Sequence, residues 1–382
     1  MAELLNGKVN LIAFYLPQYH SIPENDMAWG KGFTEWTNVR KASPLFKGHV
    51  QPKIPLNNNY YNLMDDNIAE WQSNIAQENG IFGFCYYHYW FKNGKKLLEK
   101  PAERMLATKS ITIPFCFCWA NENWSKRWDG GTDEVIVEQD YGDERDWEDH
   151  FRYLLPFLQD SRYITMNNRP VLIIYRPDEI DRLNEMISYL RRRTVEEGLA
   201  GLTVIFQHPR ALMNCVENAN DLCKAFENYS KKIDFDYYIM FEPLFTWQEQ
   251  KMKSTIGRIQ DKINNRIKRM IYHTVKGTPI LYDYDNVWKR ILNRNNCHDR
   301  MLTGAFVNWD NTPRRKDGQV IINSSPLKFE KYLTELVQKV KTSSNHRVIF
   351  ITAWNEWGEG CYLEPDDMNG YSYLNAVSNS IG

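Results

Sequence analysis

Eight short apolar runs, separated by longer polar segments, constrain the fold of this chain more than any other feature. Continuous runs rich in β-branched and aromatic residues are typical of strands that are buried on both faces, as in a parallel sheet. The runs cover residues 9–15, 81–86, 111–118, 170–175, 202–207, 235–241, 301–307 and 347–352. Helical patterns lie between them, at residues 67–79, 145–159, 179–197 and 326–341. Gly80 and Gly198 follow two of these segments and indicate helix ends.

Eight strands alternating with helices predict an α/β fold of the (β/α)₈ TIM-barrel type, with long βα loops. A dinucleotide-binding sheet is disfavoured, because no GxGxxG pattern follows the first run. We expect one catalytic domain over residues 1–382, with a basic helical insertion around residues 246–276. The isoleucines of this insertion recur at helical spacing. Its basic face would either contact a membrane surface or partner, or be the solvated side of an outer helix.

Charge and hydropathy exclude several functional classes. The net charge of −1 gives no reason to expect nucleic-acid binding. No apolar stretch is long enough to be an integral membrane segment, and the first ten residues lack a signal-peptide pattern. We therefore expect a cytoplasmic protein, or a periplasmic one if a signal has been removed. The seven cysteines form no CxxC pair, which indicates free thiols.

Neither a metal nor a cofactor is expected. Asp65-Asp66 and Asp366-Asp367 lack the ligand spacing of a calcium loop and are interpreted as helix caps or surface loops.

Aromatic residues make up 14% of the chain, with 13 Trp and 22 Tyr. Flat rings suit the C–H faces of sugars, although a tryptophan-rich core is an equally good interpretation. In a TIM barrel the site forms at the C-terminal ends of the strands. Carboxylates, amides and rings gather there in this chain, as a glycan site requires. The candidate substrate-binding residues are Tyr15, Gln18, Glu35, Trp36, Tyr87, His88, Trp90, Trp119, Asn121, Glu122, Trp128, Trp309, Trp354 and Asn355.

Glu356 and Glu359, directly after the eighth run, are the candidate catalytic carboxylates. Cleavage of a glycosidic bond needs two carboxyl groups. If this loop begins a helical turn, both side chains lie on one face, about 5–6 Å apart at Cβ, which favours a retaining geometry. Two such close charges would separate their pKa values, so that one group stays protonated. The alternative is a pair that stabilises a helix N-terminus.

Glu122 is the second candidate for proton transfer, because an Asn-Glu pair follows the third run; Glu35 is the third. Either could instead bind hydroxyl groups. His20 and His88 could orient a carboxylate or contact sugar, and a structural role is about as probable for a lone histidine in an aromatic stretch.

Five long segments carry a resemblance to a known family. They are AFYLPQYH at 13–20, GFTEWTN at 32–38, GFCYYHYW at 83–90, CWANENW at 118–124 and WNEWGEG at 354–360. Together they resemble the WbsX-type proteins of bacterial polysaccharide loci, often labelled glycosyltransferases, over residues 9–365. The barrel and the pattern Asn355-Glu356-Trp357-x-Glu359-Gly360 are similar to glycoside hydrolase family 99, the endo-α-mannosidases.

The likeness to family 99 implies a retaining mechanism without a glycosyl-enzyme ester. Glu356 would take the proton of the sugar 2-hydroxyl, whose oxygen then attacks the anomeric carbon to give an epoxide-like intermediate. Glu359 would protonate the leaving oxygen and later activate water. This chemistry needs a 2-hydroxyl trans to the leaving group, as in α-mannosides and α-rhamnosides. Family 99 enzymes usually carry His where this chain has Gly358.

We therefore expect a retaining glycoside hydrolase or transglycosylase whose partner is an oligo- or polysaccharide. The alternative is a glycosyltransferase of O-antigen or capsular polysaccharide biosynthesis. Against it, Asp234-x-Asp236 lies at the start of a predicted strand, the wrong end for a sugar-nucleotide metal site. A glycan-binding module without catalysis is a third possibility, disfavoured by the presence of both glutamates.

Overall fold

The computed structural model describes residues 1–382 except 5–6, 127–133, 216–221, 252–278 and 296–297. Eight parallel strands form a closed barrel, which confirms the predicted (β/α)₈ fold. The circle closes where β15 pairs with β2 through Val348 and Asn10. In order around the barrel, the strands are β2 (Asn10–Tyr15), β3 (Gly83–Trp90), β5 (Phe115–Trp119), β9 (Arg169–Ile174), β10 (Thr203–Phe206), β11 (Tyr237–Ile239), β13 (Met301–Phe306) and β15 (Val348–Thr352).

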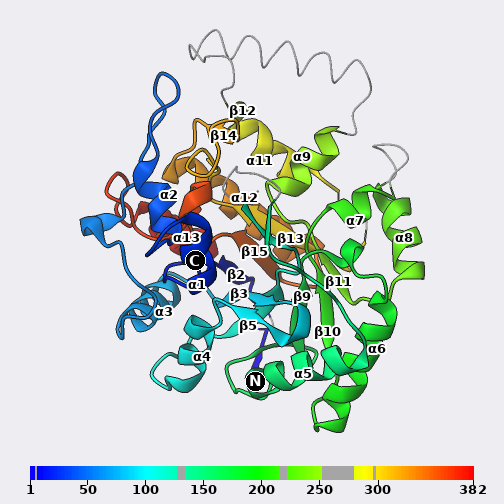
Figure 1. Cartoon of the computed structure of the whole chain (residues 1–382). Coiled ribbons are helices and arrows are strands. Elements are labelled where there is room, and N and C mark those ends of the chain that lie inside the picture. Colours follow the sequence, from blue (N-terminus) through cyan, green and yellow to red (C-terminus); the bar gives the residue numbers. More distant parts are fainter. Residues whose placement is uncertain (5–6, 127–133, 216–221, 252–278, 296–297) are drawn as a thin grey trace.

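Helices surround this barrel (Figure 1). They are α1 (Pro23–Trp29), α2 (Glu35–Lys41), α3 (Ile68–Glu78), α4 (Lys100–Ala107), α5 (Glu144–Leu158), α6 (Leu183–Glu196), α7 (Arg210–Met213), α8 (Leu222–Lys232), α9 (Leu244–Lys251), α11 (Tyr284–Asn293), α12 (Pro326–Ser343) and α13 (Ser372–Ile381).

The four predicted helices correspond to α3, α5, α6 and α12. Helix α6 begins four residues later than predicted, because a separate 3₁₀ turn, η4 (Pro177–Glu179), precedes it. Gly80 and Gly198 follow α3 and α6 with left-handed φ values of 84° and 83°, a conformation that glycine adopts without strain. Most of the predicted basic insertion, from residue 252 to 276, lies outside the described residues.

The loops between these elements contain short strands and 3₁₀ turns. The strands are β1 (Ala2–Glu3) beside β8 (Ile164–Met166), β4 (Lys96–Leu97) beside β3, β6 (Trp124–Ser125) beside β7 (Val135–Val137), β12 (Ile280–Asp283) beside β14 (Gln319–Ile322) and β16 (Asn355–Glu356) beside β17 (Cys361–Tyr362). The remaining turns are η1 (Leu56–Asn58), η2 (Lys92–Gly94) and η5 (Trp357–Glu359).

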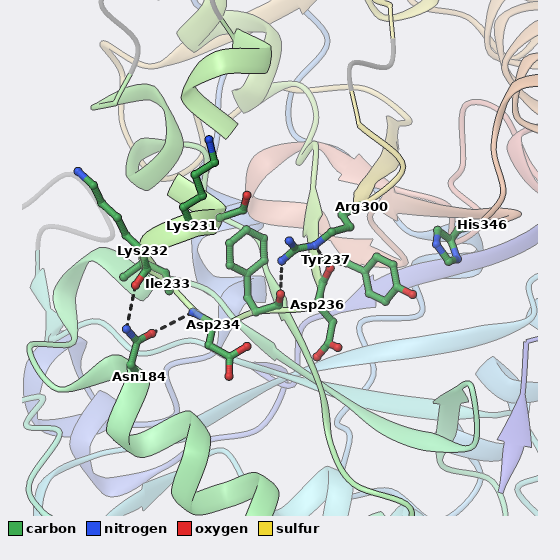
Figure 2. A pocket seen from close by; sticks show the side chains of 11 residues that line it. Asn184, Lys231, Lys232, Ile233, Asp234, Asp236, Tyr237, Arg300 and His346 are labelled. Carbon is green, nitrogen blue, oxygen red and sulfur yellow. Dashed lines mark hydrogen bonds between the residues drawn. The ribbon is translucent and has the colours of Figure 1, made fainter. Parts of the chain in front are cut away.

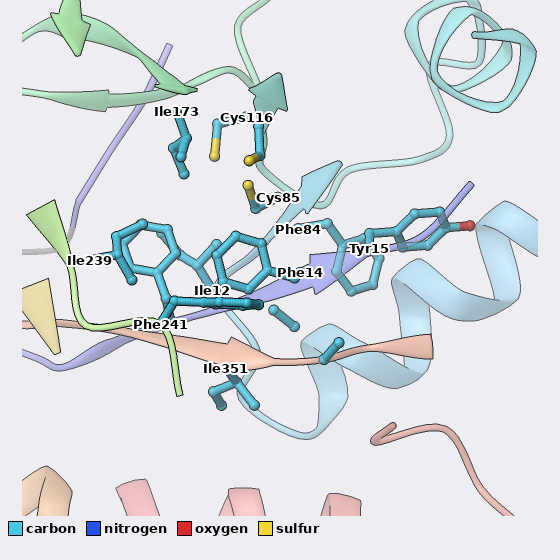
Figure 3. Close-up of a cluster of buried hydrophobic side chains, with 14 of the residues drawn as sticks. Ile12, Phe14, Tyr15, Phe84, Cys85, Cys116, Ile173, Ile239, Phe241 and Ile351 are labelled. Atoms are coloured by element: carbon cyan, nitrogen blue, oxygen red, sulfur yellow. The ribbon is translucent and has the colours of Figure 1, made fainter. Parts of the chain in front are cut away.

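Side chains from different strands fill the barrel interior. The ring of Phe14 contacts those of Tyr87, Phe241 and Phe350 at centroid distances of 5.4–5.8 Å. Figure 3 shows Phe14 and Phe241 beside Ile12, Ile239 and the thiols of Cys85 and Cys116. Because successive strand residues face opposite sides, Tyr15 points outward instead and donates a hydrogen bond to Gln72 of α3.

The cysteines agree with the sequence prediction. All six that lie among the described residues are free thiols, and the seventh, Cys297, falls outside this part of the chain. None of the helices that the structure describes is long and apolar enough to span a bilayer.

Candidate active site

Glu356 and Glu359 lie on a tight hairpin at the C-terminal end of β15. Glu356 ends β16, Glu359 ends the 3₁₀ turn η5, and Gly360 then turns the chain into β17 with a left-handed φ of 59°. The loop is thus a hairpin around one 3₁₀ turn, and no α-helix starts there. Tyr19 fixes its backbone, since its hydroxyl donates to the carbonyl of Asn355 and accepts from the amide of Trp357.

Arg314 joins these two carboxylates to a third. It lies in the loop between β13 and β14, and only 5% of its side chain is exposed. Its Nε donates to Glu35 Oε1 at 3.0 Å, its Nη2 donates to Glu356, and its Nη1 lies 2.9 Å from Glu359 Oε1. One guanidinium therefore contacts three glutamates from two separate segments: Glu35 at the start of α2, and Glu356 and Glu359 on the hairpin after β15. We call these four residues the carboxylate cluster.

Glu35 reaches this cluster because it begins α2. Thr34 caps that helix with a capping box, and the amide of Glu35 donates to the carbonyl of Gln18 at 3.0 Å. The Glu35 side chain is fully buried. Sequence analysis ranked Glu35 as a candidate, and the structure places it next to Glu356 and Glu359.

Arg314 was missed by sequence analysis. It follows the seventh strand, where a TIM barrel places functional groups, but it stands within the basic segment Arg314-Arg315-Lys316, which resembles a solvated surface. The need of several buried carboxylates for a cation could have drawn attention to it.

Burial governs the protonation of the cluster. It raises the pKa of Glu356 to about 8, and the charges of Glu359 and Glu35 add to this effect while Arg314 opposes it. Burial also raises the pKa of Glu359, again against the effect of Arg314. One cation cannot balance three neighbouring anions, two of which are buried, so the cluster favours states that hold a proton at neutral pH.

Glu122 belongs to a neighbouring ionic group. Its carboxylate pairs with Arg176, which also binds Asp178 at 2.9 Å and Glu179. Burial raises the pKa of Glu122 despite Arg176. The charges of both Glu122 and Glu359 act on Tyr175 at the end of β9, so Glu122 faces the same mouth of the barrel.

Among the predicted binding residues, Tyr87 approaches the cluster. Burial is the main cause that raises the pKa of Tyr87, and the charge of Glu356 is a smaller cause in the same direction. Tyr87 accepts a hydrogen bond from Gln207 at 3.1 Å. Burial and the charge of Glu356 also raise the pKa of Tyr89, whereas Arg314 lowers it. The charge of Glu356 therefore acts on both tyrosines.

Four other candidates are buried and engaged in internal contacts. Asn355 accepts from the amide of Leu16 at 2.8 Å and donates to its carbonyl at 3.0 Å, so it ties the hairpin to the loop after β2. Asn121 makes the same pair of bonds to the backbone of Arg176. Trp354 packs against Phe84 outside the barrel, as does Tyr15. These residues hold the loops in place.

Trp36 packs against the hairpin, and the carbonyl of Gln18 accepts a hydrogen bond from Glu35. Trp36 donates to the carbonyl of Tyr61 at 2.8 Å and packs against Trp357. Gln18 is fully buried, yet neither atom of its amide has a hydrogen-bond partner among the described residues. The same holds for the amide of Asn38 and for Glu35 Oε2.

His88, Trp90 and Trp119 point away from the barrel axis toward α5. His88 Nε2 lies 2.9 Å from His150 Nε2, and burial lowers the pKa of His88 to about 3. Trp90 stacks on the ring of His150, and Trp119 donates to the carbonyl of Trp90 at 3.0 Å. Strand alternation places His88 opposite the inward-facing Tyr87.

The remaining candidates have internal contacts of their own. Trp309 is buried edge-on against Trp247. The ring of His20 contacts the carbonyl of Pro17 at 3.1 Å. Asp366 accepts hydrogen bonds from Tyr362 and Asn369 and shapes a loop, but its side chain is buried, and Asp367 is the exposed member of the pair. Trp128 lies outside the described residues.

A cavity of 480 Å³ opens at the opposite end of the barrel (Figure 2). It is lined by residues at the N-terminal ends of β11, β13 and β15, including Tyr237, Arg300 and His346. Arg300 is already engaged, since it donates to the backbone carbonyl of Asp236 at 2.8 Å. This face of a TIM barrel serves stability, so we assign the site to the end that carries the carboxylate cluster.

Relatives and solved structures place the chain among known proteins. The uncharacterized proteins WxcX of two Xanthomonas campestris pv. campestris strains, B100 and ATCC 33913, are both 33% identical over 375 residues, 97% of this chain. The chain spans about half the length of these relatives, 49% of each. A glycoside hydrolase-like protein shares the fold at 13% identity and a TM-score of 0.56, over 99% of this chain and 95% of the other.

The family 99 endo-α-mannosidase of Bacteroides thetaiotaomicron has the same fold, at 12% identity and a TM-score of 0.51, over 99% of this chain and 97% of that enzyme. A family model described as glycosyltransferase WbsX matches residues 11–377, almost the whole barrel and both glutamates of the hairpin. The chain therefore belongs to the WbsX family.

Proposed function

We propose that this protein is a retaining glycoside hydrolase, or a transglycosylase using the same residues, that acts on an α-mannoside- or α-rhamnoside-like linkage in a bacterial polysaccharide. The carboxylate cluster carries this proposal, because Arg314 gathers Glu35, Glu356 and Glu359 at the catalytic end of a TIM barrel. The likeness of the fold to a family 99 endo-α-mannosidase supports the linkage class.

The cluster can supply an acid and a base at the same pH. General acid–base catalysis needs one protonated and one ionised carboxyl. With a single cation for three neighbouring carboxylates, the cluster keeps a proton while Arg314 stabilises an ionised partner. The active form is the one in which Glu359 carries the proton and Glu356 is ionised, and because burial raises the pKa of Glu356 to about 8, this form is the minor one at neutral pH.

In the first step, the Glu356 carboxylate removes the proton of the 2-hydroxyl, and O2 attacks the anomeric carbon. The glycosidic C–O bond breaks, and the leaving oxygen takes the proton of Glu359. In the second step, the Glu359 carboxylate removes a proton from water, and the water oxygen attacks the anomeric carbon. This attack opens the three-membered, epoxide-like ring of the intermediate, while Glu356 returns its proton to O2. Both glutamates regain their starting states. With a sugar hydroxyl in place of water, the product is a transglycosylated chain.

Oligosaccharide cleavage tests the proposal. Wild-type protein, Glu356→Gln and Glu359→Gln are incubated with α-mannans, α-rhamnans and bacterial O-polysaccharides, and products are followed by mass spectrometry and by the anomeric NMR signals of the first-formed product. We expect retention of configuration in the wild type and a loss of at least about 100-fold in each variant.

Glu185→Gln on the exposed side of α6 is the matched control and should keep full activity. Full activity in both Glu356→Gln and Glu359→Gln would refute the assignment. An inverted product would refute the mechanism, and a selective loss in Glu122→Gln would move the acid to Glu122.

A glycosyltransferase is the second candidate, favoured by the description of the family model. It would transfer a sugar from an activated donor to a growing polysaccharide. Thermal unfolding with sugar nucleotides and with manno- or rhamno-oligosaccharides separates the two functions, since a ligand stabilises the protein that binds it. A raised Tm with a sugar nucleotide alone would favour the transferase.

A further inference from the structure

A second cavity, of 420 Å³, lies behind the catalytic hairpin. Its floor contains Trp357 and Glu364, both buried, and its wall includes Trp71 of α3. Asn57, Asn58 and Asn59 line it from the η1 turn, and Tyr371 lines it from the start of α13. We call it the rear pocket. Its volume falls within the range of small-ligand sites.

The lining of the rear pocket has the chemistry of a neutral-sugar site. Among the described residues that line it there is no lysine, arginine or histidine, so these residues offer no cation to a phosphate or sugar nucleotide. The carboxyl of Glu364 is occupied by Gln72 Nε2, Trp357 Nε1 and the Tyr61 hydroxyl, at 2.6, 2.6 and 2.9 Å. What remains for a ligand is a set of amides and aromatic rings, which suit hydroxyls and C–H faces.

The η1 turn presents its amides in an unusual way. Asn57 and Asn58 both adopt left-handed backbone conformations, with φ values of 58° and 55°, and both are exposed. The side chains of Asn57, Asn58 and Asn59 all line the pocket. Tyr371 is 43% exposed, so an aromatic surface stands free at the same pocket.

The rear pocket also adjoins the catalytic loop through Trp357. This residue stands between Glu356 and Glu359 in the chain, and its ring stacks on Tyr362 at a centroid distance of 3.7 Å. A polymer held in the rear pocket would therefore be bound on the same hairpin that carries both glutamates.

We propose that the rear pocket binds a single neutral sugar unit of the polysaccharide and anchors the polymer beside the catalytic hairpin. The choice of a sugar as ligand rests on the proposed function. The pocket does not take part in bond cleavage.

Two pairs of matched variants test the pocket in the full chain. Asn57→Gly/Asn58→Gly removes two amides while keeping the left-handed turn, because glycine adopts that conformation freely. Asn167→Gly/Asn168→Gly is its control, since these two exposed asparagines form a left-handed pair with φ values of 55° and 60° in the turn between β8 and β9. Tyr371→Ala removes the ring, and Tyr371→Phe keeps it.

Binding is measured in the Glu356→Gln background by saturation-transfer NMR titration with short neutral manno-, rhamno-, gluco- and N-acetylhexosamine oligosaccharides. We expect the asparagine pair and Tyr371→Ala to weaken binding about fivefold, the effect of one lost net hydrogen bond or ring contact, and both controls to bind normally. With Glu356 intact, the same variants should cleave long polymer more slowly and short oligosaccharides at the normal rate.

Equal binding in all four variants, or no binding of any sugar by the parent protein, would overturn the rear pocket while leaving the cleavage test unaffected. Pocket-dependent binding without any cleavage by the wild type would overturn the proposed function alone.

Discussion

A carboxylate oxygen of Glu35 occupies the space in which residue 358 would carry a β-carbon. An ideal β-carbon on Gly358 would lie 1.6 Å from Glu35 Oε1 and 2.9 Å from Arg314 Nε. The φ of Gly358 is not left-handed, so the need for glycine is steric. The departure from the histidine of family 99 therefore has a physical reason: Glu35 and Arg314 fill that position here.

Gly358→Ala should displace Glu35 and Arg314 and lower kcat about 100-fold, because small shifts of catalytic groups are costly. Glu35→Ala removes the obstructing atoms, so Gly358→Ala should cost much less activity in that background. The measurement is a double-mutant cycle on kcat, with Tm as a check on folding. Additive effects in the double variant would show that Glu35 does not enforce glycine at position 358.

Arg314→Gln should shift the pH profile of kcat/KM. Arg314 lowers the pKa of both Glu356 and Glu359, so its removal raises both pKa values. The ionised base then forms only at higher pH, so the acidic limb of the pH profile shifts to higher pH. Activity should fall more at about pH 6 than at about pH 8. Arg314→Lys retains the charge, so its acidic limb should lie at the same pH as that of the wild type. One ammonium group cannot contact three carboxylates, so kcat should stay below the wild-type value. An unchanged acidic limb in Arg314→Gln would contradict this reasoning.

Glu364→Gln should remove the part of the pH dependence of Tm that comes from the titration of Glu364. Burial raises the pKa of Glu364 to about 7, although three donated hydrogen bonds oppose this shift. A carboxyl whose pKa is raised by folding stabilises the native state at low pH, and this contribution is lost as pH rises through the folded pKa. The Tm of the wild type should therefore decline relative to Glu364→Gln between about pH 5 and pH 8. A constant difference in Tm over that range would mean that Glu364 is ionised throughout.

Asn355→Asp should destabilise the fold rather than weaken substrate binding. The amide group of Asn355 is fully buried and donates to the carbonyl of Leu16. A carboxylate at this position would place a second hydrogen-bond acceptor next to that carbonyl, with no donor between them. The expected cost is about 3 kcal/mol in the free energy of unfolding. Chemical denaturation measures this, and KM at a temperature where the variant is folded should stay near the wild-type value. A normal stability with a raised KM would instead indicate direct contact with substrate.

The fold was readable from the sequence because the barrel imposes a local signal. Each parallel strand must be apolar on both faces, so each of the eight runs overlaps one barrel strand: β2, β3, β5, β9, β10, β11, β13 or β15. Position also had predictive value, since residues that follow a barrel strand lie at one end. This rule placed Glu35, Glu356 and Glu359 at the same mouth of the barrel.

The tertiary structure alone decided which of these residues meet. His88 and Tyr87 are neighbours in the sequence, but strand alternation sends Tyr87 into the barrel and His88 out to His150. Arg314 lies 279 positions from Glu35, yet donates to it at 3.0 Å. Hydrophobic periodicity is a local property that every strand repeats, whereas the pairing of buried charges depends on loops brought together only when the barrel closes. The sequence thus determined the barrel and the end that carries the site, and the closed fold determined the cluster of three carboxylates around one arginine.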